Sequence, residues 1–330
     1  MCNNITAFPV ISAAKVNFAF LYYAPLTTTS KAHIAVLLTN LFFGINFSLV
    51  KLISPTLVGP YALNILRVTG SLILMWSAWF WGRHLSKEKT VAAGIEKKDI
   101  GRFAICGLTG VAINQTFFIK GLTITSTIHA SLLMLCTPLM ITLLAFWILK
   151  ERITTAKAIG IALGIGGASL LIISKDKGAG TSSWEGDLLI ITNAISYTFY
   201  FILVKPLMSR YPPQHVIRWV FTFGLLMILP VGAQQFTEIR WEAFQFTHIA
   251  ALTFIVICGT YLAYSFTIYG IQHLGAGVTG SYIYTQPVFA SMVAILFLHE
   301  VMTGQKVIAA ALIFTGVYLV SLHKRVTYAR

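Results

Sequence analysis

Long apolar segments follow one another along almost the whole chain, separated by short stretches with prolines, glycines or charges. A helix rises 1.5 Å per residue, so about 20 apolar residues cross the roughly 30 Å core of a bilayer. Ten segments meet this requirement: residues 32–53, 60–82, 102–119, 125–149, 155–174, 187–204, 216–234, 248–271, 276–298 and 305–322. The pattern predicts an all-α integral membrane protein with ten transmembrane helices.

Composition agrees with this prediction and leaves little room for other functions. Hydrophobic residues make up 57% of the chain and charged residues 10%, whereas soluble domains are about 25% charged. The four cysteines have no paired spacing, so neither a disulfide framework nor a metal site is expected. No nucleotide-binding P-loop, HExxH or GxSxG motif occurs, so the sequence predicts neither an enzyme nor a cofactor.

The basic residues predict the orientation. Loops on one side of the predicted membrane carry roughly three times as many Lys and Arg as loops on the other, which assigns both termini to the cytoplasm. The formal charge of +14 then reflects topology and contact with anionic lipid, and no nucleic-acid partner is expected. We expect residues 1–31 to form a cytoplasmic extension, residues 324–330 a basic cytoplasmic tail, and the inner cell membrane to be the location.

One block of sequence occurs twice. The stretch "TPLMITLLAFWILKERIT" at residues 137–154 returns as "QPVFASMVAILFLHEVMT" at residues 286–303, an offset of 149 that also aligns Gly110 with Gly259. The chain is therefore two halves, residues 32–174 and 187–323. Because each half has five spans, the second must cross the membrane in the opposite sense, and such inverted repeats serve alternating access in carriers.

Several stretches resemble the EamA-type members of the drug/metabolite transporter superfamily. They are "LFFGINFSLVK", "YALNILRVTGSLIL", "HASLLMLCTPLMITLLAFWILKERIT" and "QPVFASMVAILFLHE". The resemblance covers nearly the whole chain from residue 32. It implies a central pathway and the export or facilitated movement of small organic solutes such as amino acids. A nucleotide-sugar or lipid-linked carrier and a channel-like facilitator remain as alternatives, and we expect a monomer or weak homo-oligomer.

Polar side chains inside lipid are costly unless they face the interior of the bundle, so they mark the candidate substrate pathway. Asn193, Tyr197 and Tyr200 share one helical face, as do Tyr282 and Gln286. Any of these side chains could instead form an interhelical hydrogen bond. The full candidate set is Asn40, Asn46, Asn114, Gln115, His129, Asn193, Tyr197, Tyr200, Tyr261, Tyr264, Tyr282 and Gln286.

Prolines and buried charges are further candidates. Pro138 and Pro287 interrupt their spans at equivalent positions, and each is interpreted as a hinge or as a packing kink. Arg67 lies roughly 10 Å into its span, where it would bind a substrate carboxylate or serve a structural or gating role. Glu151 and Glu300 precede the next helix, so we expect each to complement the dipole at that helix's N-terminus.

Two further features concern coupling and packing. His129 is the one histidine among the candidates, and histidine is the usual side chain for proton transfer at physiological pH, so it suggests either proton coupling or a neutral hydrogen-bonded histidine. No Asp or Glu is well placed within the predicted spans, which favours facilitated diffusion or exchange. The small residues Ala156, Gly160, Gly164 and Ala168 recur every four positions and predict close helix packing, within one chain or between subunits.

Overall fold

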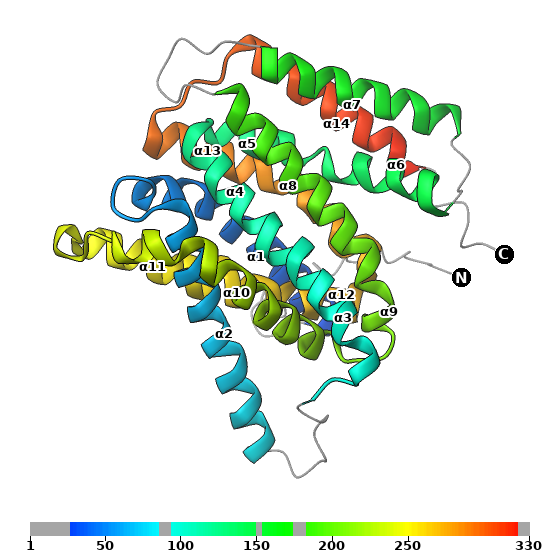
Figure 1. The fold of residues 1–330 in the computed structure, drawn as a ribbon. Helices are drawn as coiled ribbons and strands as arrows, with labels where there is room; N and C mark the ends of the chain where they lie inside the picture. Colours follow the sequence, from blue (N-terminus) through cyan, green and yellow to red (C-terminus); the bar gives the residue numbers. More distant parts are fainter. Residues whose placement is uncertain (1–26, 86–93, 150–153, 174–182, 323–330) are drawn as a thin grey trace, which may run out of the picture.

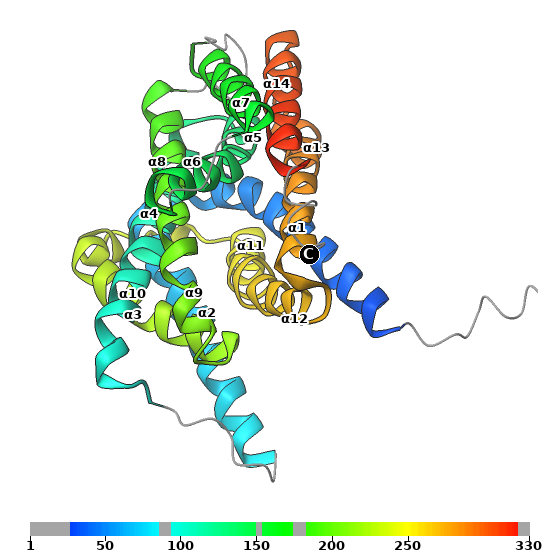
Figure 2. The same ribbon diagram turned by 90° about the vertical axis from the view of Figure 1, so that its right-hand side faces the viewer.

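The computed structural model describes residues 27–85, 94–149, 154–173 and 183–322, and this part of the chain is a bundle of helices (Figures 1 and 2). Nine of its helical segments are long and apolar enough to cross a membrane, and a shorter apolar helix covers Gly304–Val320. The prediction of an all-helical membrane protein is confirmed. The helices are α1 (Thr28–Ile53), α2 (Pro60–Leu85), α3 (Ile100–Gly107), α4 (Ile113–Ile124), α5 (Thr127–Met134), α6 (Thr137–Leu149), α7 (Thr155–Ile173), α8 (Trp184–Leu203), α9 (Lys205–Met208), α10 (Pro213–Thr237), α11 (Phe246–Val256), α12 (Ala263–Ser281), α13 (Gln286–Leu298) and α14 (Gly304–Leu322).

Most spans run a few residues past the predicted boundaries. The helix α1 begins at Thr28, and its N-cap Thr27 accepts a hydrogen bond from the backbone N–H of Ser30. Residues 28–31 therefore belong to the first helix, whereas the sequence placed them in a terminal extension. Hydropathy detects only the part of a helix that lies in lipid, whereas capping residues set where the helix begins.

Four spans are interrupted, in two matched pairs. A π-helical segment, Leu108–Ala112, joins α3 to α4, and another, Ile257–Leu262, joins α11 to α12. These two segments coincide under the 149-residue offset. A π-helical turn shifts the hydrogen-bonding register by one residue, and such turns are frequent at functional sites. The duplication seen in the sequence is thus repeated in the backbone geometry.

The second matched pair of interruptions involves the candidate hinges. The span that begins at α5 breaks after Met134, and Pro138 lies in the first turn of α6. In the second half a short 3₁₀ turn, Tyr282–Thr285, precedes α13, whose first turn contains Pro287. A proline costs little in a first turn, because the N–H that it lacks has no helical partner there. The hinge role of both prolines stays a prediction.

The two halves interleave instead of forming separate lobes. The helix α1 packs against α12 and α13, α4 against α8, α2 against α10, and α7 against α14. The close pairing of α7 with α14 is visible in both views (Figures 1 and 2). The small-residue stripe of α7 therefore serves packing within one chain. Gly160 lies so close to α14 that an added Cβ would meet the carbonyl oxygen of Gly316 at 2.5 Å.

We predict that Gly316→Ala destabilises the protein. A Cβ at this position would collide with the backbone of Gly160 and Gly164, and overpacking of this kind costs about 1 to 3 kcal/mol. The matched control is Gly166→Ala on α7, where an added Cβ meets nothing within 4 Å. Thermal unfolding in detergent should show a lower midpoint for Gly316→Ala alone. Equal midpoints for the two variants would contradict the packing described for α7 and α14.

Candidate substrate site

Asn114 and Asn193 join the helices α4 and α8 through two hydrogen bonds. The Nδ2 of Asn114 on α4 donates to the carbonyl oxygen of Asn193 at 3.2 Å, and the Nδ2 of Asn193 on α8 donates to the carbonyl oxygen of Asn114 at 2.6 Å. The pair links the two halves deep in the bundle. The side-chain NH2 group of each asparagine thus joins the two helices. Oδ1 of Asn193 has no hydrogen-bond partner.

Arg67 is buried on α2 and held by the other half of the chain. Only 4% of the residue is exposed, and its Nε donates to Oγ1 of Thr260 at 3.1 Å. The Thr260 hydroxyl in turn donates to the carbonyl oxygen of Ile255, five residues earlier, at 2.9 Å. The π-helical segment places Thr260 in this position. A guanidinium has five N–H donors, and Nη1 of Arg67 has no hydrogen-bond partner.

A glutamine and a tyrosine join the halves in a second contact. Nε2 of Gln115 on α4 donates to the hydroxyl oxygen of Tyr264 on α12 at 3.4 Å. The Tyr264 ring makes edge-to-face contacts with Phe43 and Phe221. Oε1 of Gln115 is buried without a hydrogen-bond partner. This group therefore combines an aromatic surface with an available polar acceptor.

The two π-helical segments bring each half against a predicted pathway residue of the other. Gly110 lies against the ring of Tyr200, where an added Cβ would come within 2.5 Å of a ring carbon. Gly259 lies against Asn46, whose Oδ1 would be 2.7 Å from an added Cβ. Only glycine permits these approaches. Sequence reasoning missed a similar side chain, Asn64 on α2, which is fully buried and whose Oδ1 also has no partner.

Other predicted pathway residues have different surroundings. Nδ2 of Asn40 donates to the carbonyl of Val36 in its own helix. The Tyr282 hydroxyl hydrogen-bonds to Nδ1 of His33 at 2.8 Å, near the start of α1. Two members of the set stay close to the interrupted segments. Tyr261 lies half-buried within a π-helical segment, and Gln286 is buried at the start of α13.

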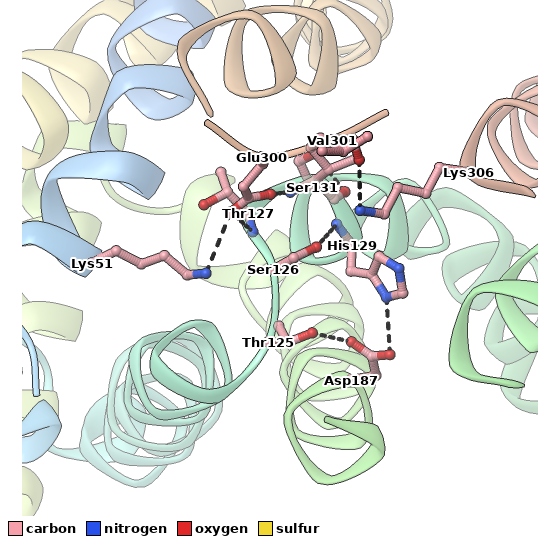
Figure 3. Close-up of polar contacts among 11 residues, drawn as sticks. Lys51, Thr125, Ser126, Thr127, His129, Ser131, Asp187, Glu300, Val301 and Lys306 are labelled. Carbon is pink, nitrogen blue, oxygen red and sulfur yellow. Dashed lines mark hydrogen bonds and ion pairs between the residues drawn. The ribbon is translucent and has the colours of Figure 1, made fainter. Parts of the chain in front are cut away.

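Glu300 connects the two halves through polar contacts, which Figure 3 draws. Its two carboxylate oxygens accept the backbone N–H groups of Thr127 at 2.7 Å and of Ile128 at 3.1 Å, in the first turn of α5. Nζ of Lys51 on α1 lies 3.4 Å from Oε1. We call these three contacts the Glu300 clamp. The expectation that Glu300 complements the next helix was wrong in detail, because it caps a helix of the other half.

The local backbone explains how Glu300 reaches α5. His299, the residue after α13, has a left-handed conformation with φ of 54°. This conformation costs a non-glycine residue about 1 to 2 kcal/mol. The backbone N–H of Glu300 then donates to the carbonyl of Ala294. The turn directs the chain back toward the first half. Glu151, the equivalent residue under the repeat, lies outside the described residues.

His129 has a buried carboxylate partner that the sequence analysis overlooked. Nδ1 of His129 lies 3.2 Å from Oδ2 of Asp187, and both side chains are at most 1% exposed. Thr125 donates to the other carboxylate oxygen of Asp187. The predicted spans therefore do contain a well-placed acid, Asp187, contrary to the expectation from the sequence. Asp187 lies near the start of its span, and pattern alone did not distinguish a buried acid there from a solvated one.

Lys306 completes this charged cluster. It lies at the start of the tenth predicted span, is 2% exposed, and its Nζ donates to the carbonyl oxygen of Val301 at 2.9 Å. Figure 3 shows it on the far side of His129 from Asp187. The signal available in the sequence was the alignment of Lys306 with Lys157 under the repeat offset.

Comparison with known proteins identifies the family. The model of the EamA-like transporter family matches residues 30–173 and again residues 184–322. The chain is 27% identical over 228 residues to a probable terminal-alkyne amino-acid exporter of Streptantibioticus cattleyicolor, covering 68% of this chain and 74% of that protein. It is 26% identical over 295 residues to an uncharacterized transporter of Archaeoglobus fulgidus, covering 88% of this chain and 97% of that protein.

A solved structure described as a crystal structure of a protein shares the fold. Its TM-score is 0.57 at 19% sequence identity, and the match covers 92% of this chain and 99% of the other. The family model matches both halves separately, as the internal repeat requires. The protein is a multi-pass membrane transporter and not an enzyme, and it belongs to the EamA-like transporter family.

Proposed function

We propose that this transporter is a secondary carrier that exports small organic metabolites, amino acids among them, by alternating access between its two inverted halves. It acts as a monomer or weak homo-oligomer in the inner membrane, with both termini in the cytoplasm. The observation that carries the proposal is Arg67, a buried cation held by Thr260 of the opposite half, with Nη1 available to a ligand. The resemblance to a probable amino-acid exporter supports the substrate class.

The chemistry around Arg67 suits an amino acid. A guanidinium binds a carboxylate through parallel charge-assisted hydrogen bonds. Oε1 of Gln115 is an acceptor that an ammonium group would satisfy, and it adjoins the aromatic group around Tyr264. An aromatic and amide-lined site accepts an apolar side chain as well as a charged end. Carriers of nucleotide sugars or lipid phosphates would need several clustered cations, whereas the described residues around Gln115 and Tyr264 supply one cation, Arg67.

The Glu300 clamp suits one end of an alternating-access cycle. It joins α1 and α5 of the first half to the turn before α14 of the second half. Opening at this end requires these contacts to separate, and the halves must then be held together elsewhere. By the basic-residue count, this is the end that faces away from the cytoplasm. The clamp is therefore proposed as the outer gate.

We predict that Arg67→Gln lowers amino-acid counterflow in proteoliposomes by at least about tenfold, because a hydrogen bond to a charged group contributes about 1.5 to 3 kcal/mol. Arg240→Gln, which removes an exposed cation, is the matched control and should transport normally. In the unmodified protein, an amino acid should compete for transport whereas the amine lacking its carboxyl group should not. Equal competition by the two compounds would refute the carboxylate site even if the variant failed to fold.

A second candidate mode is proton coupling, which the buried His129–Asp187 pair favours. Intramembrane ionisable pairs recur in proton relays. Thr125 also contacts Asp187. Three charged side chains from other elements lie in the same region: Lys51 on α1, Glu300 after α13 and Lys306 on α14 (Figure 3). The pair is close to the Glu300 clamp along the chain, because His129 follows directly after Thr127 and Ile128, whose N–H groups bind Glu300. A proton taken up by the pair would therefore change the charge near the proposed outer gate.

If coupling operates, an imposed pH gradient accelerates transport by the unmodified protein, and Asp187→Asn abolishes the acceleration while counterflow persists. The physical reason is that exchange needs no net proton movement, whereas uphill movement does. Glu185→Gln removes an exposed acid two residues before Asp187 on the same helix, and this variant should retain the response. Transport that does not respond to the gradient in the unmodified protein would exclude coupling and leave facilitated exchange.

A further inference from the structure

A basic pocket lies at the opposite end of the bundle from the Glu300 clamp. It has a volume of about 500 Å³ and is lined by Lys98, Asp99, Arg102, Ile105, Leu203 and Arg210. Its walls come from the start of the third span and from the chain around α9, which lie next to each other (Figure 1). The basic-residue count assigns this end to the cytoplasm. No residue of the proposed substrate site contributes to it.

The pocket has three cations, of which two are paired and one is free. Nζ of Lys98 lies 2.6 Å from Oε2 of Glu96. Nη1 of Arg210 donates to Oδ1 of Asp99 at 2.8 Å, and the Tyr211 hydroxyl donates to Oδ2 at 2.9 Å. Partial burial and the Asp99 carboxylate raise the pKa of Tyr211, which keeps its hydroxyl protonated as the donor. Each oxygen of Asp99 is therefore occupied. Arg102 is exposed and has no hydrogen-bond or ion-pair partner among the described residues.

The lining changes from cationic to apolar with depth. Lys98, Arg102 and Ile105 are spaced i, i+4 and i+7, which places them on one face of the third span. On the opposite wall, Leu203 lies on α8 and Arg210 follows α9. Ile105 is 50% exposed, and it lies further along the span, toward lipid, than Arg102. The cations thus form the rim of the pocket and the aliphatic side chains form its floor.

We propose that this pocket binds the phosphate-bearing headgroup of an anionic phospholipid of the cytoplasmic leaflet, with the first part of an acyl chain against Ile105 and Leu203. Basic pockets between transmembrane helices on the cytoplasmic side bind such headgroups. The order of charge and apolar surface matches a lipid, whose phosphate lies at the membrane surface and whose chains point inward. A soluble phosphate compound would share the cationic contacts but gain nothing from the exposed aliphatic floor.

The test is a titration of the purified full-length protein in detergent with phosphatidylglycerol or phosphatidylcholine, followed by native mass spectrometry. Phosphatidylglycerol should bind in preference, and Arg102→Gln should weaken its binding roughly fivefold, since one cation near the surface contributes about 1 kcal/mol. Lys97→Gln is the matched control, because Lys97 is an exposed cation one residue before Lys98 that does not line the pocket. It should bind phosphatidylglycerol as the unmodified protein does.

Two results would overturn the proposal. Equal loss of binding in Arg102→Gln and Lys97→Gln would mean that the basic surface attracts lipid without a defined site. Displacement of phosphatidylglycerol by millimolar inorganic phosphate would assign the pocket to a soluble phosphate compound. Both variants carry exposed substitutions outside the proposed transport site, so unchanged counterflow in them separates this proposal from the proposed carrier function.

Discussion

A backbone amide inside a bilayer has no water to bind, so every interruption of a transmembrane helix must be closed by another part of the protein. This constraint connects the main features of the molecule. The break before α5 is closed by the side chain of Ser126 and by the carboxylate of Glu300 from the other half. The register shift before α12 lets Thr260 hold Arg67. Groups from one half thus stabilise an interruption in the other half, and an interruption in turn places a side chain where it binds the other half.

Interleaved inverted repeats make this exchange reciprocal. The π-helical segments fall at equivalent positions, and each places a glycine against a polar or aromatic residue of the opposite half, Gly110 against Tyr200 and Gly259 against Asn46. Gly275, with φ of 81°, occupies the position that aligns with Ser126. Matching breaks at matching depth allow the two halves to bend in opposite senses. Such paired bending is the physical basis that we propose for alternating access.

The sequence predicted the helical membrane fold because the apolar segments and the duplicated block can be recognised from the order of the residues alone. It did not predict the partners of individual charges. Glu300 was assigned to the following helix because sequence shows only neighbours along the chain, whereas its carboxylate caps α5. Asp187 and Lys306 stand at the starts of their predicted spans, where the sequence does not distinguish a solvated charge from a buried one, and tertiary packing buries both. The π-helical segments had no signal except the aligned glycines, since a register shift leaves hydropathy unchanged.

The central claim is that the two halves move against each other around the buried polar site. The most direct measurement is the distance between spin labels at Thr56, after α1, and Val301, beside the Glu300 clamp, in a background without the four native cysteines. The account predicts two distance populations that shift with saturating amino acid, and a larger share of the longer distance in Glu300→Gln. A single distance that neither amino acid nor Glu300→Gln changes would contradict it.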